Sequence, residues 1–282
     1  MYQVSKLGHG LTDATAQMPH MSSVSLGIWV GVGSRYEPAE RNGVCHFIEH
    51  LLFKGTRKRT AHQISQAVEG IGGYLNAFTS EENTCFHARA SHRHFDDLLD
   101  VLMDMLLHSR FLPEDVDKER EVVKEEVSMC LDEPQHLVQE VLNALVWEGH
   151  PLGRPITGTF ESLDGLKRPQ LVDWLKHNYV TGTTVVVATG RVTHREVRRA
   201  VGRYAGSLSR GTEPFFIPAE SKQSAPGLRL VTRKTEQTQL ALGIRTCSRH
   251  DRRRFALRLI NTMLGENMSS RLFQVVREDR GL

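Results

Sequence analysis

The stretch CHFIEHLLFKGT, residues 45–56, contains two histidines four residues apart, with a glutamate directly before the second. Residues four apart on a helix lie on one face, so His46 and His50 could bind the same ion. Imidazole is a good zinc ligand, and the carboxylate of Glu49 could reach a water molecule on such an ion. The pattern alone is only suggestive, because histidines on an apolar helix face are more often ordinary core or surface residues.

A catalytic zinc ion needs a third protein ligand, and the segment EDVDKEREVVKEEVSMCL, residues 114–131, offers candidates. On a helical wheel centred on Val123, Glu119 falls about 40° from the apolar centre and Glu126 about 60° from it. A carboxylate on the buried side of a helix is costly unless it binds a metal or is paired. Spacing alone leaves two alternatives equally open: a metal ligand, or a boundary glutamate paired with an arginine.

These candidate ligands need a scaffold of strands and helices. The chain has 282 residues, a length that suits about two domains. Apolar residues make up 39% and charged residues 24%, which is typical of a globular protein. Hydrophobic patterning predicts mixed strands and helices, with the helices clustered, so we expect an α+β fold. The predicted strands are 22–33, 74–80, 83–90 and 183–190, and the predicted helices are 44–53, 60–73, 92–109, 114–131, 135–148, 169–179 and 194–205.

A weak internal repeat indicates duplicated domains. Residues 26–28 and 242–244 both read Leu-Gly-Ile, and a strand-like pattern followed by a helix-like pattern surrounds each. The stretch between them that is rich in Pro, Gly and Ser predicts a linker at 206–227. We therefore expect an N-terminal domain at 1–205 and the start of a homologous domain at 228–282. The second copy has FALRLINTML where the first has HFIEHLL, so only the first keeps the polar triad.

Composition argues against several kinds of partner. The net charge is +3 and no nucleic-acid motif is present, so we expect the arginine-rich run at 248–258 to be a solvated helix face and no nucleic acid to bind. Residues 1–17 lack the apolar run of a secretory signal, and no stretch is apolar enough to span a membrane. The four cysteines are scattered, which is typical of reduced thiols. We expect a cytoplasmic protein with no membrane partner.

The segment NGVCHFIEHLLFKGT closely resembles the active-site helix of the pitrilysin–insulinase family of zinc metallopeptidases, whose inverted HxxEH motif is the inverzincin signature. The segments GSRYEPAERNG, GGYLNAFTSEENTCF and EREVVKEEV resemble other parts of that family. The β-type subunits of mitochondrial processing peptidase and many bacterial proteins are similar. The resemblance implies two homologous α/β-sandwich-like domains, each with an antiparallel-rich sheet packed with helices, the second incomplete in this chain.

The resemblance also implies the roles of the polar residues. His46, His50 and Glu126 are expected to bind one zinc ion per chain. Glu49 is expected to act as general base on water and then as general acid toward the leaving amine. Glu119 is expected to orient one of the two histidines through its other ring nitrogen.

Substrate contacts are expected from two further places. Asn76, Ala77 and Phe78 resemble the edge strand that holds the substrate peptide as an added strand. Arg277 resembles an arginine that assists the substrate carbonyl, together with a tyrosine that would follow Leu282. Because this tyrosine and about half of the second domain are missing, we expect the 282 residues to bind zinc but to hydrolyse peptides weakly.

Two functions are compatible with these features. The first is a zinc endopeptidase that hydrolyses short or unfolded peptides, and the second is a non-catalytic subunit that binds peptides or supports an active partner. The presence of all three ligands and the base favours the enzyme. We expect peptide substrates, and assembly either as a homodimer or with a homologous partner subunit.

Overall fold

The computed structural model describes residues 2–8, 10–220, 223 and 225–282. Contacts within the chain divide it into two units. Unit 1 runs to Pro218 and includes Arg229–Ala241, and unit 2 comprises Ala219–Leu228 and Leu242–Leu282. The domain limits at 205 and 228 stay a prediction.

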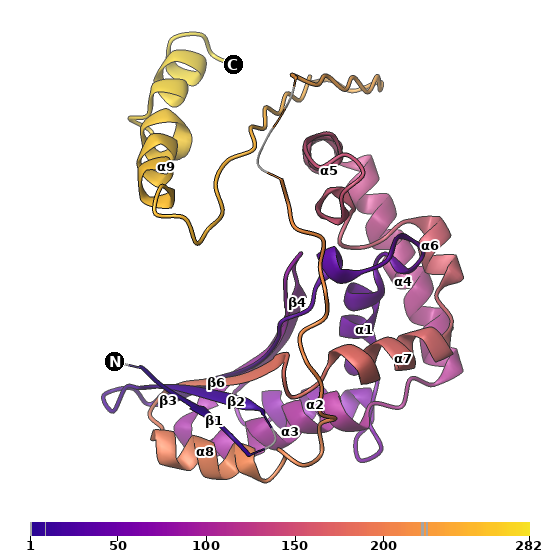
Figure 1. The fold of residues 1–282 in the computed structure, drawn as a ribbon, viewed down its shortest axis with the longest axis vertical. Coiled ribbons are helices and arrows are strands. Elements are labelled where there is room, and N and C mark those ends of the chain that lie inside the picture. Colours follow the sequence, from indigo (N-terminus) through magenta and orange to yellow (C-terminus); the bar gives the residue numbers. More distant parts are fainter. Residues whose placement is uncertain (1, 9, 221–222, 224) are drawn as a thin grey trace. The chain divides into compact units, whose positions relative to one another are not determined.

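Unit 1 is built around one mixed six-stranded sheet (Figure 1). Its order is β1-β2-β6-β3-β5-β4, and β2 and β6 are parallel while all other neighbours are antiparallel. The strands are β1 Tyr2–Lys6, β2 Thr12–Gln17, β3 Ser23–Val30, β4 Tyr74–Thr79, β5 Thr84–Ser91 and β6 Thr184–Gly190. All four predicted strands are present, and β1 and β2 were not predicted. The α+β fold class is confirmed.

The central strand β3 shows how the sheet separates its two faces. Val24, Leu26 and Ile28 are fully buried or nearly so, whereas Trp29, the residue after Ile28, is exposed. Successive side chains of a strand point to opposite faces, so this alternation defines one face toward the core. Helices α3 and α8 lie along that face of the sheet (Figure 1).

The helices agree with the predicted ones to within a few residues, apart from the short α6, which was not predicted. Local signals set several ends: Thr60 closes a capping box with Gln63 before α2, and Pro113 begins α4. The helices are α1 Val44–Leu52, α2 Ala61–Glu69, α3 Phe95–His108, α4 Pro113–Asp132, α5 Pro134–Val146, α6 Phe160–Gly165, α7 Arg168–Asn178, α8 His194–Gly202 and α9 Arg254–Asn261.

Helix α1 is held on several sides. It packs against α4, α7 and β4, and its apolar residues Phe47, Ile48 and Leu51 are buried. The loop after it is fixed by Asp104, which is buried and accepts hydrogen bonds from the Thr56 hydroxyl and the Arg59 guanidinium, each at 2.7 Å. The polar residues of α1 therefore stand on a rigid element, as a precise site requires.

Part of the predicted linker packs within unit 1. The ring of Phe216 lies under the Arg35 guanidinium, 4.3 Å from its Cζ, and makes an edge contact with Tyr36. The carbonyl of Ile217 accepts a hydrogen bond from Arg35 Nη2 at 3.2 Å and lies 3.1 Å from His150 Nε2. We call residues 213–217 the strap, because they lie across the loop that precedes α1.

Unit 2 contains the helix that the repeat predicted, but not the strand before it. Helix α9 is followed by π-helical turns at Thr262–Glu266 and Phe273–Glu278. Residues 242–246 of unit 2 form no strand, and Leu242 and Ile244 are exposed. A strand requires a neighbour for its backbone N–H and C=O groups, and none of the described strands pairs with this segment.

Candidate metal centre

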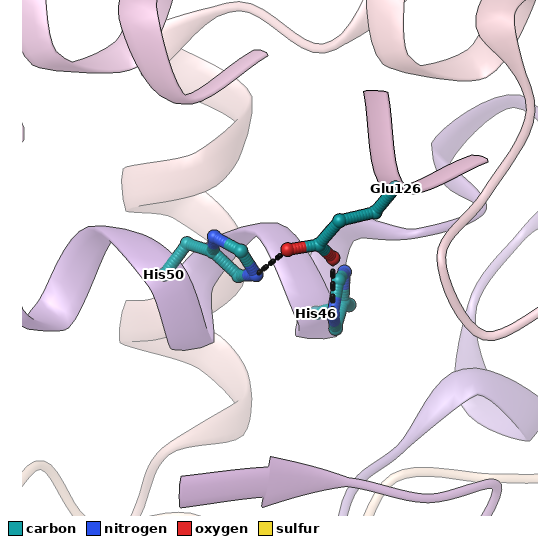
Figure 2. A group of neighbouring side chains, drawn as sticks. All are labelled: His46, His50 and Glu126. Atoms are coloured by element: carbon teal, nitrogen blue, oxygen red, sulfur yellow. Dashed lines mark ion pairs between the residues drawn. The ribbon is translucent and has the colours of Figure 1, made fainter. Parts of the chain in front are cut away.

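Helix α1 presents His46 and His50 side by side, with ring centroids 4.7 Å apart. Glu126 on α4 faces both of them (Figure 2). Its two carboxylate oxygens lie 3.6 Å from His46 Nε2 and 3.6 Å from His50 Nε2. One ligand atom from each residue lies within 4.8 Å of the others. The structure thus brings together the three predicted zinc ligands, which come from segments about 76 residues apart in the sequence.

The spacing of these atoms suits one zinc ion. Bonds of zinc to nitrogen or oxygen are about 2.0–2.2 Å long, so two ligand atoms on a tetrahedral ion lie about 3.3–3.6 Å apart. The two separations of 3.6 Å, one to each oxygen of Glu126, fall at the end of that range. With one ligand atom taken from each residue, the spacing extends to 4.8 Å, so the side chains would move closer together around a bound ion. Two imidazoles and a carboxylate are also a donor set found in catalytic zinc sites.

The protonation of His46 supports the same assignment. Burial, with a smaller effect from His50, lowers the pKa of His46 to about 4, so its imidazole is neutral at pH 7. Its Nδ1 is buried and has no hydrogen-bond partner among the described residues. A neutral ring beside the Glu126 carboxylate gains little from that anion, whereas a cation between the two would be stabilised by both.

His50 is oriented through its second ring nitrogen. Its Nδ1 lies 3.2 Å from Glu119 Oε2, and the other oxygen of Glu119 is 2.6 Å from Lys54 Nζ. The Glu119 side chain is 6% exposed, so these two partners compensate a buried carboxylate. A carboxylate behind a ligating histidine fixes the ring and its tautomer. Glu119 thus lies against His50, and its orienting role stays a prediction.

Glu49 is hydrogen-bonded to the strand beside the helix. Its Oε2 accepts from the Thr79 hydroxyl at 2.6 Å, at the last residue of β4. Burial raises the pKa of Glu49, and the neighbouring Glu126 raises it further, while the Thr79 hydrogen bond and His50 lower it. A raised pKa suits a carboxylate that must take up and return a proton.

The N-terminus of α1 is capped by a residue outside the helix. Glu37 Oε1 accepts from the Cys45 N–H at 2.9 Å, and Glu37 Oε2 accepts from the Gly43 N–H at 2.7 Å and from Asn42 Nδ2 at 3.0 Å. Burial raises the pKa of Glu37 to about 7, although these hydrogen bonds act in the opposite direction. Both oxygens accept from N–H donors, which is the arrangement of an ionised carboxylate.

The predicted substrate residues lie in two places. Asn76, Ala77 and Phe78 are on β4, which is the last strand of the sheet and pairs only with β5 among the described strands. The ring of Phe78 makes an edge contact with Trp29, with centroids 5.5 Å apart. Arg277 belongs to unit 2, where its guanidinium lies over the Phe273 ring. The roles of all four stay predictions.

Three residues near the site were missed by sequence analysis. Lys54 follows His50 by four residues, so the helical spacing could have placed it on the same face. Thr79 is the last residue of the strand that carries Asn76–Phe78. Because side chains alternate between the two faces of a strand, the sequence could have indicated which face Thr79 occupies. Glu37 gave no signal, because a loop residue that caps a distant helix end follows no periodicity.

The family models identify the relatives of this chain. Residues 13–160 match the model described as insulinase, peptidase family M16, and residues 165–282 match the peptidase M16 inactive domain. The chain belongs to the insulinase family. The family resemblance read from the HxxEH helix is thereby confirmed.

Curated members of the M16 family are similar over nearly the whole chain. An uncharacterized zinc protease of Mycobacterium leprae is 42% identical over 277 residues, which cover 97% of this chain and 62% of that protein. The uncharacterized zinc protease YmxG of Bacillus subtilis is 39% identical over 283 residues, covering 97% of this chain and 66% of YmxG. The chain thus spans less than two thirds of the length of these relatives. Both relatives carry the name zinc protease.

Solved structures of two bacterial proteins share the fold. A protease from Helicobacter pylori superposes with a TM-score of 0.85 at 19% identity, covering 100% of this chain and 69% of that one. A peptidase M16 inactive domain from Pseudomonas fluorescens gives a TM-score of 0.83 at 17% identity, with the same coverage. None of the helices in the described residues is both long and apolar enough to cross a membrane.

Proposed function

We propose that this protein is a zinc-dependent endopeptidase that hydrolyses peptide bonds in short or unfolded peptides. The observation that carries the proposal is the arrangement around α1. This one helix carries two of the three ligands and Glu49, and Glu49 is hydrogen-bonded to β4, the strand at the edge of the sheet. One zinc ion per chain is expected.

The chain's own residues would divide the reaction between them. Zinc held by His46, His50 and Glu126 would supply a Lewis acid that lowers the pKa of water to about 7 and polarises a carbonyl. Glu49 accepts the proton of the attacking water on its carboxylate, and the Thr79 hydroxyl holds that carboxylate in place. The protonated Glu49 then donates to the leaving amine.

The edge of β4 gives the proposed substrate site its geometry. An edge strand presents unpaired N–H and C=O groups, and an extended peptide can add to it as a further strand. Such a peptide would run along Asn76–Phe78 toward Thr79, whose side chain contacts Glu49. A folded protein rarely offers a free extended segment, so short or unfolded peptides fit this site best.

A peptidase assay on the purified chain tests the proposal. The zinc-loaded protein is incubated with an internally quenched unstructured peptide, and the products are sequenced by mass spectrometry. We expect weak internal cleavage that stops on removal of zinc and returns when zinc is restored. Zinc binding at full stoichiometry without any cleavage would contradict the proposed activity.

A second candidate is a non-catalytic subunit that binds peptides or supports an active partner. The match of residues 165–282 to the M16 inactive domain is the observation that supports this second candidate. Peptide binding without turnover, together with cleavage in the presence of a homologous subunit, would support this alternative. We propose either a homodimer or such a pair, which light scattering on the zinc-loaded protein distinguishes. Cytoplasmic location stays a prediction.

A further inference from the structure

The N-terminal end of the zinc helix has no cap of its own. Its N-cap is Gly43, in the left-handed region at φ 89°. A Cβ at this position would lie 2.6 Å from the Thr157 carbonyl and 2.8 Å from Gly158 Cα, both of them backbone atoms. The close approach therefore excludes the Ser, Thr, Asp or Asn that usually caps a helix. The first N–H groups of α1 have no partner within the helix and need acceptors from elsewhere.

Glu37 supplies these acceptors from six residues upstream of the N-cap. Its two oxygens together accept the N–H groups of Gly43 and Cys45 and the side-chain amide of Asn42, at 2.7–3.0 Å. The residue is 2% exposed, so water does not compete for these hydrogen bonds. The carboxylate also lies at the end of the helix where the backbone dipoles favour a negative charge.

Glu37 is itself held in place from two directions. Arg154 Nη1 donates to the Glu37 carbonyl at 2.7 Å, and the Asn42 amide that contacts Glu37 also donates to the Pro155 carbonyl at 3.0 Å. The Asn42 carbonyl accepts from the Ser162 hydroxyl at 2.8 Å. The carboxylate therefore connects α1 to residues 154–162, and it is not a mobile surface cap.

The position of this cap bears directly on His46. Cys45, whose N–H is held, is the residue before His46 in the first turn of α1. The His46 ring has no hydrogen bond at Nδ1 among the described residues, so its direction depends on the backbone and on packing. His50, in contrast, is held through its ring by Glu119.

We propose that Glu37 is a positioning residue of the zinc site, which acts through the backbone of the first turn of α1 to fix the direction of His46. The inference rests on the proposed zinc site, but not on the peptidase activity. Outer partners of metal ligands typically change metal affinity by about 10–100-fold when they are replaced. We expect an effect of this size from Glu37, although it touches neither ring.

The test compares Glu37→Gln with Glu40→Gln. The amide that Glu37→Gln introduces would direct its own N–H groups at the N–H donors of the helix end, whereas Glu40 is exposed in the same loop and serves as a matched control. Zinc Kd is measured by competition with a chromophoric chelator, at a temperature where circular dichroism shows each variant folded. Hydrogen exchange of the peptide containing residues 43–52 is followed by mass spectrometry.

We expect Glu37→Gln to raise zinc Kd by about 10–100-fold, to speed exchange in the first turn of α1, and to reduce the increase in Tm on zinc addition. Glu40→Gln should change none of these. A merely structural role would lower Tm with and without zinc equally and leave the Kd of the folded protein unchanged. That result would overturn the proposal.

A second variant, Glu37→Asp, tests the proposal if Glu37→Gln does not fold. Glu37→Asp keeps the charge but is one methylene shorter, so it cannot reach the partners of both oxygens and should give an intermediate rise in Kd. A folded Glu37→Asp with wild-type Kd and wild-type exchange would overturn the proposal as well. Failure of the zinc site itself looks different, because the unaltered protein would then bind no zinc.

Discussion

The two ends of helix α1 hold their histidines in different ways. At the C-terminal end, the His50 ring contacts Glu119 on α4, and Glu119 is paired with Lys54. At the N-terminal end, the His46 ring has no such partner among the described residues, and Glu37 holds the backbone instead. One helix can thus present two ligands whose orientation depends on separate parts of the fold.

The orientations of the two histidines of the proposed metal site are therefore fixed in two different ways. The C-terminal end is controlled by side chains of α1 and α4 and by Lys54, which follows α1. The N-terminal end is controlled by a buried loop residue and by the close approach of Gly43 to Gly158. Changes at the C-terminal end should act on a ring, and changes at the N-terminal end should act on the helix backbone.

The largest effect is expected from removing the ring at either end. His46→Ala and His50→Ala each delete one of three zinc ligands, so both should reduce bound zinc from one ion per chain to a small fraction of that. Elemental analysis after gel filtration measures this directly. His62→Ala, on the exposed face of α2, is the matched control and should keep its zinc. Full zinc content in either ligand variant would show that the ion binds elsewhere.

The next largest effect is expected from replacing Glu49, which lies between His46 and His50 on α1. Glu49→Gln keeps the ligands but cannot accept a proton, and loss of general-base catalysis costs about 10²–10⁴-fold in kcat. Zinc content should stay at the wild-type level, because Glu49 is not among the three grouped ligands. Glu125→Gln, on the exposed side of α4, is the control. Near-normal kcat in Glu49→Gln would remove this residue from the mechanism.

The two ends also differ in how much of them the sequence reveals. The wheel of residues 114–131, centred on Val123, placed Glu119 on the buried side of α4, and Glu119 is buried. His46 and His50 share a face for the same reason of periodicity. These contacts follow from the 3.6-residue repeat of a helix and are readable without a structure. Glu37 is not, because its partners are set by how a loop folds back.

The strand β2 was missed for a related reason. Asp13 and Thr15 are buried polar residues of β2, so the usual alternation of apolar and polar residues is absent there. Thr15 is instead matched by His194 at the start of α8, whose Nδ1 lies 3.0 Å from its hydroxyl. That partner is 179 residues away, and no local pattern predicts it.

A smaller effect is expected at the C-terminal end when the ring is kept but its support is changed. Glu119→Gln retains the shape of the side chain and loses the charge that His50 and Lys54 face. Zinc Kd should rise by about 10–100-fold. Hydrogen exchange of the first turn of α1 should stay unchanged, in contrast to Glu37→Gln.

Exposed Glu121 on the same helix provides the control, and Glu121→Gln should leave zinc Kd at the wild-type value. If Glu119→Gln instead speeds exchange at the N-terminal end of α1, the two ends of the helix are not controlled separately. An unchanged Kd in a folded Glu119→Gln would show that the ring of His50 is held by packing alone.

The smallest effect is expected from the strap, which contacts Arg35, Tyr36 and His150. Phe216→Ala removes the contact between its ring and the guanidinium, and partly exposed cation–π contacts contribute about 0.5–1 kcal/mol. The free energy of unfolding in urea should fall by about that amount, with zinc Kd unchanged. Phe215 is 84% exposed, so Phe215→Ala is a matched control with no expected change. Equal stability of the two variants would show that the strap contact contributes nothing, and a raised zinc Kd in Phe216→Ala alone would extend the control of His46 beyond Glu37 to the strap.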